Sequence, residues 1–144
     1  MRYAKVAFED VTVGDELPPL VKGPIEQIQL TRYAGASGDF NPIHQDEAFA
    51  RAAGMGGVFG HGMLSMGFVA QAITDWAGAG TVRRLGVRFA ALVRLTDVVT
   101  CRGRVLSKSS KDDVDLVELE VWAENQRGEK VVSGRATVAL ASRG

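Results

Sequence analysis

A single apolar helix followed by four strand-like runs limits most strongly how this chain can fold. Apolar residues recur at helical spacing from Gly62 to a glycine-rich stop at 77–80, which predicts a helix with a broad apolar face. The period then changes, and the runs rich in Val, Leu, Thr and Arg lie at 82–93, 97–107, 114–124 and 130–140. Strands without helices between them predict an antiparallel meander wrapped around one helix, an α+β architecture.

The run 114–124 shows the alternation of a half-buried strand most clearly. Trp122 falls on its polar face together with glutamates. The residues expected to face the core are Val117, Leu119, Val121 and Ala123. The sequence Asn-Gln-Arg-Gly at 125–128 then predicts the turn of a hairpin.

Short sequence patterns predict the elements in the first half of the chain. Residues 1–20 are expected to form an arm whose Val11, Val13 and Leu17 contact the core. The remaining predicted elements are a strand over 20–30 weakened by Pro24, a short helix capped by Thr31 that ends at 36, and a helix over 46–53.

Composition excludes several classes of protein. The 144 residues are 46% hydrophobic, which suffices for one domain over 1–144. Lys plus Arg and Asp plus Glu both number 17, so neither a nucleic-acid partner nor a membrane partner is indicated. The only cysteine, Cys101, has no partner for an internal disulfide. Because no signal peptide is seen either, a cytoplasmic location is expected.

The loop after the first predicted helix carries the strongest chemical signal. Gly38 and Pro42 disfavour a regular helix, so Asp39 and His44 are expected on a bent segment that turns both side chains into one pocket. A carboxylate beside an imidazole is an acid/base pair that operates near neutral pH. The residues alone also allow a plainer interpretation, in which Asp39 or Asn41 only closes an Asx-turn and His44 only caps a helix.

The start of the apolar helix carries a second signal. The first turn of a helix has free N–H groups and the positive end of the helix dipole. A glycine lets a ligand carbonyl approach the backbone, so the Gly62 N–H is a candidate oxyanion donor. Alternatively, Gly60 and Gly62 simply connect a loop to a helix.

Together, Ser-Gly-Asp-Phe-Asn-Pro-Ile-His at 37–44 and His-Gly-Met-Leu at 61–64 resemble the signature of MaoC-like dehydratases, the (R)-specific enoyl-CoA hydratase group of the hot-dog fold. The resemblance implies that Asp39 and His44 activate water or move the substrate proton, and that the Gly62 N–H polarises a thioester carbonyl. Asn41 is expected to support the loop. The resemblance also implies a single MaoC-like hot-dog domain.

The implied substrate is an acyl-CoA or acyl carrier protein thioester. No cofactor or metal is implied, since a site built from His44 and Asp46 has no further His or Cys spacing to support it. A homodimer or higher oligomer is expected, and a heterodimer with another hot-dog chain is compatible. The alternative functions are a hot-dog thioesterase and a non-catalytic acyl-binding subunit.

One departure from the family pattern concerns the stretch 90–97. Many members have a proline there and later a Gly-Asp pair, whereas this chain reads Ala-Ala-Leu-Val-Arg-Leu-Thr-Asp. The local strand and turn geometry is therefore expected to differ from that of the family.

Overall fold

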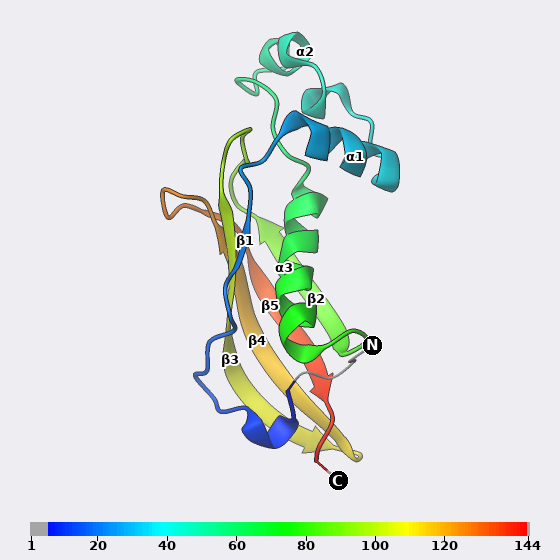
Figure 1. Ribbon diagram of the computed structural model, residues 1–144, viewed down its shortest axis with the longest axis vertical. Coiled ribbons are helices and arrows are strands. Elements are labelled where there is room, and N and C mark those ends of the chain that lie inside the picture. Colours follow the sequence, from blue (N-terminus) through cyan, green and yellow to red (C-terminus); the bar gives the residue numbers. More distant parts are fainter. Residues whose placement is uncertain (1–5, 144) are drawn as a thin grey trace.

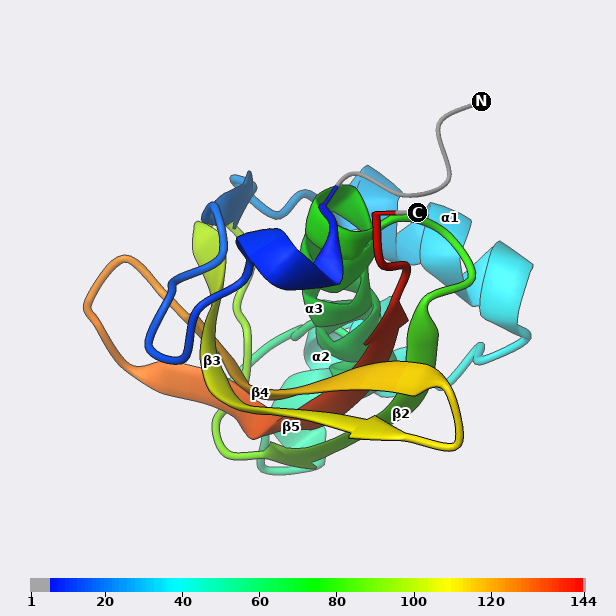
Figure 2. The same cartoon turned by 90° about the horizontal axis from the view of Figure 1, so that it is seen from below.

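A curved antiparallel sheet wraps around one long helix in the computed structural model, which describes residues 6–143 (Figure 1). The helices are α1 (Gln27–Ser37), α2 (Glu47–Ala52) and α3 (Gly62–Ala77), with short 3-10 helices η1 (Phe8–Asp10) and η2 (Pro42–His44). The strands are β1 (Leu20–Lys22), β2 (Val82–Phe89), β3 (Val99–Lys111), β4 (Val114–Glu124) and β5 (Lys130–Leu140). Figure 2 shows α3 over the concave face of the sheet. Within 6–143, no helix has the length and apolar character needed to cross a bilayer.

The strand order β1-β3-β4-β5-β2 confirms the α+β sheet and corrects the predicted meander. Strands β3, β4 and β5 do pair in succession, but β2 pairs with β5 at the far edge, where Leu85 lies opposite Ala136. The segment 90–98 explains the difference. It is too long for a tight turn, and Arg94 within it bridges to Phe59, so it carries the chain from one edge of the sheet towards the other.

The core lies between α3 and the concave face of the sheet. The four β4 residues predicted to face inwards are all buried, which confirms the alternation. Met63, one of the apolar residues that recur at helical spacing in this predicted helix, was expected on its apolar face, but it is exposed. The helix residues that are buried are Ser65, Phe68, Val69, Ala72, Ile73 and Ala77. Burial of each large apolar side chain contributes roughly 1.5–3 kcal/mol to folding, which anchors α3 to the sheet.

The predicted strand over 20–30 is wrong beyond Lys22. Strand β1 pairs with β3 for three residues only, and α1 already begins at Gln27. The Gly23-Pro24 sequence ends the strand, since proline has no N–H for a sheet ladder. Thr31 is therefore not a cap but lies inside α1. The helix ends at Gly38, whose φ of 78° is the left-handed conformation that glycine adopts most easily.

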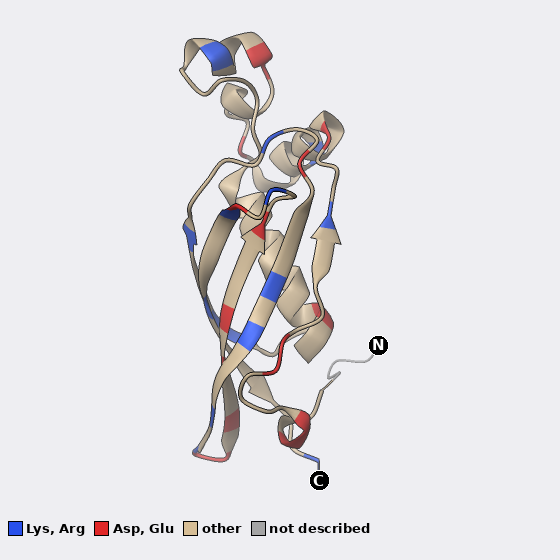
Figure 3. Cartoon of the chain, turned by 90° about the vertical axis from the view of Figure 1, so that its left-hand side faces the viewer, with Lys and Arg blue, Asp and Glu red and all other residues tan. Residues whose placement is uncertain are grey.

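The N-terminal arm follows the prediction except at Val13. Val11 and Leu17 are buried, but Val13 is exposed. Lys108 of β3 helps to hold the arm, because its Nζ donates a hydrogen bond to the Phe8 carbonyl at 2.7 Å. Residues 1–5 of the predicted arm lie outside the described residues. Both signs of charge occur on the side of the molecule in Figure 3, and neither sign dominates it.

Residues 27–61 form an overhang above the N-terminal end of α3 (Figure 1). It contains α1, η2 and α2 and the loops between them. The short helix predicted over 46–53 is α2, and the Asp46 carboxylate caps it by accepting the Phe49 N–H at 2.9 Å. The overhang places the two motifs of the sequence next to each other.

Candidate active site

The loop 38–44 is held by its own side chains. Asp39 Oδ1 accepts the Asn41 N–H at 3.2 Å, and Asn41 Oδ1 accepts the Ile43 N–H at 3.2 Å, which caps η2. These are the Asx-turn bonds of the plainer interpretation, and Asn41 takes part in them both as donor and as acceptor. His44 is the last residue of η2 rather than a loop residue. The turn occupies only Oδ1 of Asp39 and leaves Oδ2 free to face His44.

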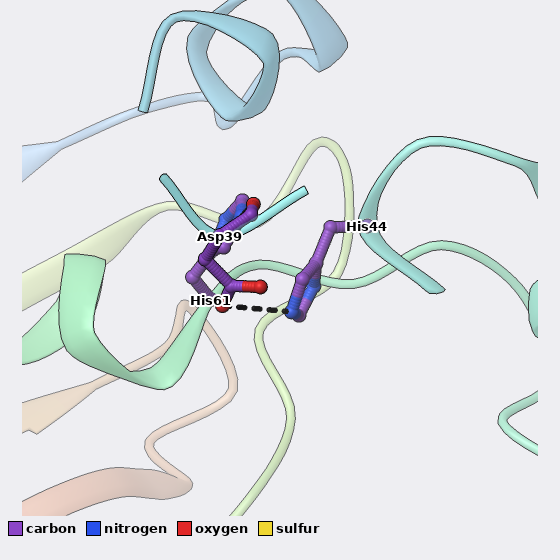
Figure 4. Close-up of side chains that lie close together, drawn as sticks. All are labelled: Asp39, His44 and His61. Carbon is purple, nitrogen blue, oxygen red and sulfur yellow. Dashed lines mark hydrogen bonds and ion pairs between the residues drawn. The ribbon is translucent and has the colours of Figure 1, made fainter. Parts of the chain in front are cut away.

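Asp39 and His44 face each other, as the bent loop predicted. Asp39 Oδ2 lies 3.9 Å from His44 Nε2 (Figure 4). The imidazole is 7% exposed and the carboxylate 51% exposed. The pair thus joins a buried ring to a carboxylate that opens to solvent, where a ligand can enter.

The Phe59 carbonyl determines which His44 nitrogen carries the proton. His44 Nδ1 lies 2.7 Å from the Phe59 oxygen. A carbonyl oxygen only accepts, so Nδ1 carries the hydrogen and Nε2 of the neutral ring has a lone pair. Nε2 and the Asp39 carboxylate are then two acceptors facing each other. Their 3.9 Å separation suits a water molecule that donates one hydrogen bond to each.

Further hydrogen bonds hold both partners of the bond between His44 Nδ1 and the Phe59 carbonyl. Gln27 of α1 donates from Nε2 to the His44 carbonyl at 2.9 Å. The segment that carries Phe59 is pinned to the β2–β3 connection, because the Gly60 N–H donates to the Val93 carbonyl at 2.7 Å and Arg94 Nη1 donates to the Gly57 carbonyl at 3.0 Å. The position of His44 therefore depends on three separate parts of the chain.

His61, the first residue of the second motif, lies beside the pair. Its Nε2 lies 3.1 Å from the Asp39 carbonyl oxygen, and its ring stacks on the His44 ring with centroids 3.9 Å apart. Burial lowers the pKa of His61 below its ordinary 6.5, and the nearby His44 lowers it further. The hydrogen bond to the Asp39 carbonyl opposes this shift without reversing it, so the pKa of His61 stays lowered and the neutral ring is favoured.

Asp39, His44 and His61 form a cluster whose ligand-type atoms lie within 4.8 Å of one another. The two imidazole planes are only 27° apart, so lone pairs in those planes run side by side instead of meeting at one point. This geometry fits a metal poorly. The weaker alternative that joined His44 to Asp46 is not supported either, because Asp46 caps α2.

Gly62 is the first residue of α3, as predicted. Among residues 6–143, no group accepts a hydrogen bond from its N–H. The Phe89 ring lies so close that a Cβ on Gly62 would be 3.2 Å from two ring carbons. Gly62 and Phe89 also line a cavity of about 230 Å³ with mainly apolar walls, to which Ser65, Val131 and Val132 contribute.

Comparison with known proteins assigns the chain to a family. The sequence model of the family described as "MaoC like domain" matches residues 10–127, which include both motifs. The chain belongs to the MaoC-like domain family. The MaoC-like chain is also 30% identical over 139 residues to the (R)-specific enoyl-CoA hydratase of Rhodospirillum rubrum, with 95% of this chain and 93% of that protein covered.

Solved structures agree with this assignment. The unliganded R-hydratase PhaJ1 from Pseudomonas aeruginosa superimposes with a TM-score of 0.86 at 29% identity, covering 98% of this chain and 89% of that one. A chain of the ChsH1-ChsH2 complex from Mycobacterium tuberculosis superimposes with a TM-score of 0.79 at 26% identity, covering 90% and 98%. The MaoC-like chain therefore has the hot-dog fold of the R-hydratases.

Three groups around the site were not predicted from the sequence. The Phe59 carbonyl has no signature in the sequence, since any residue supplies a carbonyl. Gln27 lay within the wrongly predicted strand. Phe89 was expected only as a strand residue, and its contact with Gly62 follows from the strand order rather than from the spacing of the two residues.

Proposed function

We propose that this MaoC-like chain catalyses the reversible hydration of trans-2-enoyl thioesters to (R)-3-hydroxyacyl thioesters. The observation that carries this proposal is the Asp39–His44 pair, in which two acceptors face each other at 3.9 Å and the Phe59 carbonyl sets the tautomer of His44. Such a pair can hold one water molecule and take its proton. The family and its named hydratases support enoyl-CoA hydration as the general activity.

In the hydration direction, water held by Asp39 and His44 attacks C3 of the enoyl thioester. One proton of the water passes to the pair as the C3–O bond forms. One proton passes from the pair to C2, so the pair ends as it began and the substrate gains one water. If the C3–O bond and the new C2–H bond form on the same face of the double bond, the addition is syn.

Charge develops on the thioester oxygen while C3 is attacked. The Gly62 N–H, at the positive end of the α3 dipole, is the donor we assign to that oxygen. Donors of this kind contribute roughly 2.7–4 kcal/mol to the stability of a transition state. The apolar cavity beside Gly62 offers space for part of the acyl group.

Two further features of the proposal concern partners. The thioester carrier is CoA or an acyl carrier protein. We infer that the chain works as a dimer or higher oligomer, because β2 is an edge strand and because exposed Phe40, Met63 and Phe89 flank the pair and Gly62. A heteromer is the second possibility, since one structural relative was solved as a complex of two named chains. Sedimentation of the purified chain, alone and with candidate partner chains, tests this.

The deciding experiment follows the loss of enoyl-thioester absorbance with crotonyl-CoA and with a longer trans-2-enoyl-CoA. Asp39→Asn and His44→Gln should each reduce kcat on the order of a hundred-fold or more, because each removes an acid/base group. Asp46→Asn is the matched control. This residue lies close to His44 in the chain but caps α2, so its substitution should leave kcat unchanged.

The product of the reaction separates the alternatives. (R)-3-hydroxyacyl-CoA supports the hydratase, whereas free thiol released from a saturated acyl-CoA would support a thioesterase. A folded protein without turnover on either chain length would contradict the proposal for these substrates and favour the acyl-binding subunit. The expectations of one domain over 1–144, of a cytoplasmic location and of no cofactor or metal stay predictions.

A further inference from the structure

We propose that His61 is a positioning residue for the Asp39–His44 pair, and that it acts as a permanently neutral ring with its proton on Nε2. The inference rests on the proposed function for its catalytic consequence, but its structural part concerns only His61 and its neighbours. His61 is not expected to contact the substrate. It determines where the carboxylate and the imidazole lie.

The hydrogen bond to Asp39 fixes the proton on His61. The Asp39 carbonyl oxygen, 3.1 Å from Nε2, can only accept, so Nε2 is the donor. The bond joins α3's first turn to the main chain of the residue that carries the carboxylate. The His61 ring and the Asp39 carboxylate lie 22 positions apart in the sequence, and this hydrogen bond connects the two segments that carry them.

The other nitrogen of His61, Nδ1, has no hydrogen-bond partner among residues 6–143. Nδ1 is buried without a hydrogen bond among the described residues, and the whole residue is only 1% exposed. A protonated ring would need an acceptor at Nδ1, and the part of the chain that the structure describes supplies none there. The environment therefore favours the neutral ring, in agreement with the lowered pKa.

The ring faces of His61 and His44 lie against each other. Their centroids are 3.9 Å apart and their planes differ by 27°, while Tyr33 packs edge-on against His61 with centroids 4.8 Å apart. The Phe59 ring also packs edge-on against His44, with centroids 4.9 Å apart, so two aromatic neighbours restrict the orientation of the His44 ring. A neutral His61 can remain stacked when His44 accepts a proton, whereas two charged rings at this distance would repel each other.

The two histidines are thus expected to hold opposite tautomers. His44 carries its proton on Nδ1, bonded to Phe59, and His61 carries its proton on Nε2, bonded to Asp39. The chain contains only these two histidines, so the imidazole ¹⁵N spectrum of the intact protein contains two rings. Long-range ¹H–¹⁵N correlation at pH 7 assigns each tautomer, and spectra of His61→Phe and His61→Gln assign each ring to its residue.

Two substitutions separate the contributions of His61 to catalysis. His61→Phe keeps an aromatic ring and removes the donor to Asp39, while His61→Gln keeps an N–H donor and removes the ring. We expect His61→Phe to lower kcat on the order of a hundred-fold with KM nearly unchanged, because a misplaced catalytic group affects the chemical step rather than binding. His61→Gln should recover part of this loss. Tyr33→Phe, which keeps its edge contact with His61, is the control and should leave kcat unchanged.

The outcomes distinguish this inference from the proposed function. Opposite tautomers together with a selective fall in kcat support both. If the wild-type chain shows no enoyl-CoA turnover, the proposed function fails, and the spectra alone decide the structural part. A charged His61 at pH 7, a His61 proton on Nδ1, or a folded His61→Phe variant with wild-type kcat would each overturn the inference.

Discussion

Gly62 is the residue at which one added methyl group tests the site most directly. In Gly62→Ala the new Cβ would lie 3.2 Å from the Phe89 ring, closer than an ordinary contact. Phe89 is 49% exposed and can move, so the variant should fold. We expect kcat/KM to fall at least about ten-fold, because the displaced ring and the methyl group crowd the N–H assigned to the oxyanion.

The same helix supplies the control for Gly62→Ala. Gly67 lies on the exposed side of α3, and a Cβ there would meet nothing within 4 Å. Gly67→Ala should leave kcat/KM unchanged and stabilise the protein by roughly 0.5–1 kcal/mol, since alanine favours a helix over glycine. Equal activity of wild type and Gly62→Ala in the same assay would argue against the oxyanion role.

Thr96 lies in the stretch 90–97, where this chain departs from the family pattern. Its φ is 72°, a left-handed conformation that is costly for a β-branched residue. The side chain is exposed, so little packing depends on it. Thr96→Gly should stabilise the protein by about 1 kcal/mol, measured by urea unfolding.

Two other substitutions at this position check the cause. Thr96→Asn should also stabilise the protein, because asparagine tolerates the left-handed region. Thr96→Ala keeps the Cβ that causes the strain and should give a smaller gain. Destabilisation by both glycine and asparagine would mean that the threonine side chain has a stabilising role that outweighs the strain.

The β3–β4 hairpin shows how a turn limits the stability of an element. Lys111 pairs with Val114, and the two residues between them have φ values of 49° at Asp112 and 61° at Asp113. Two positive φ values define the type I′ turn, for which Asn-Gly is the most favourable sequence. The double substitution Asp112→Asn with Asp113→Gly should raise the urea midpoint by an amount equivalent to about 1 kcal/mol.

The β4–β5 turn already has a glycine at a position with positive φ, so substitution there should lower stability instead of raising it. Gly128 has a φ of 76° and open space around a Cβ, so only its backbone conformation resists substitution. Gly128→Ala should destabilise the protein by about 1 kcal/mol. If both changes moved stability in the same direction, turn conformation would not be the factor that limits these hairpins.

Asp97 connects several parts of the whole molecule. Its side chain is 3% exposed and accepts hydrogen bonds from the Arg94 N–H at 2.9 Å and from Gln126 Nε2 at 2.8 Å, with Arg127 Nη1 at 3.4 Å. The carboxylate thus joins the β2–β3 connection to the β4–β5 turn. Burial alone raises the pKa of Asp97, but these donors outweigh it and hold the pKa below 3.8.

A lowered pKa in the folded state determines the sign of the pH effect. The stabilisation by the Asp97 charge is complete above the unfolded value near 3.8 and is lost as the pH falls through the lower folded value. Asp97→Asn should cost roughly 1–3 kcal/mol at pH 7, and the difference from wild type should shrink below the unfolded value. Asp75→Asn, on the exposed side of α3, should change stability little at either pH. An Asp97→Asn penalty that did not depend on pH would exclude the charge as its cause.

Periodicity and short motifs of the sequence by themselves determined much of this protein. The helix that starts at Gly62, the inward face of β4 and the juxtaposition of Asp39 and His44 all follow from local pattern and turn chemistry. The four long strands were predicted too, but not all of their ends, because β2 stops at Phe89 instead of 93 and β3 runs on to Lys111 instead of 107. These features were predictable because side-chain period and the backbone limits of glycine and proline act over a few residues.

Tertiary structure alone decided the strand order, the start of α1 and the groups around the pair. Strand β2 pairs with β5 because segment 90–98 crosses the molecule, and that crossing also holds Phe59 against His44. The tautomers of His44 and His61 are set by carbonyl oxygens, which every residue has. A sequence shows which side chains are available, but backbone acceptors become specific only when distant segments have been brought to within 3 Å or so of a ring nitrogen.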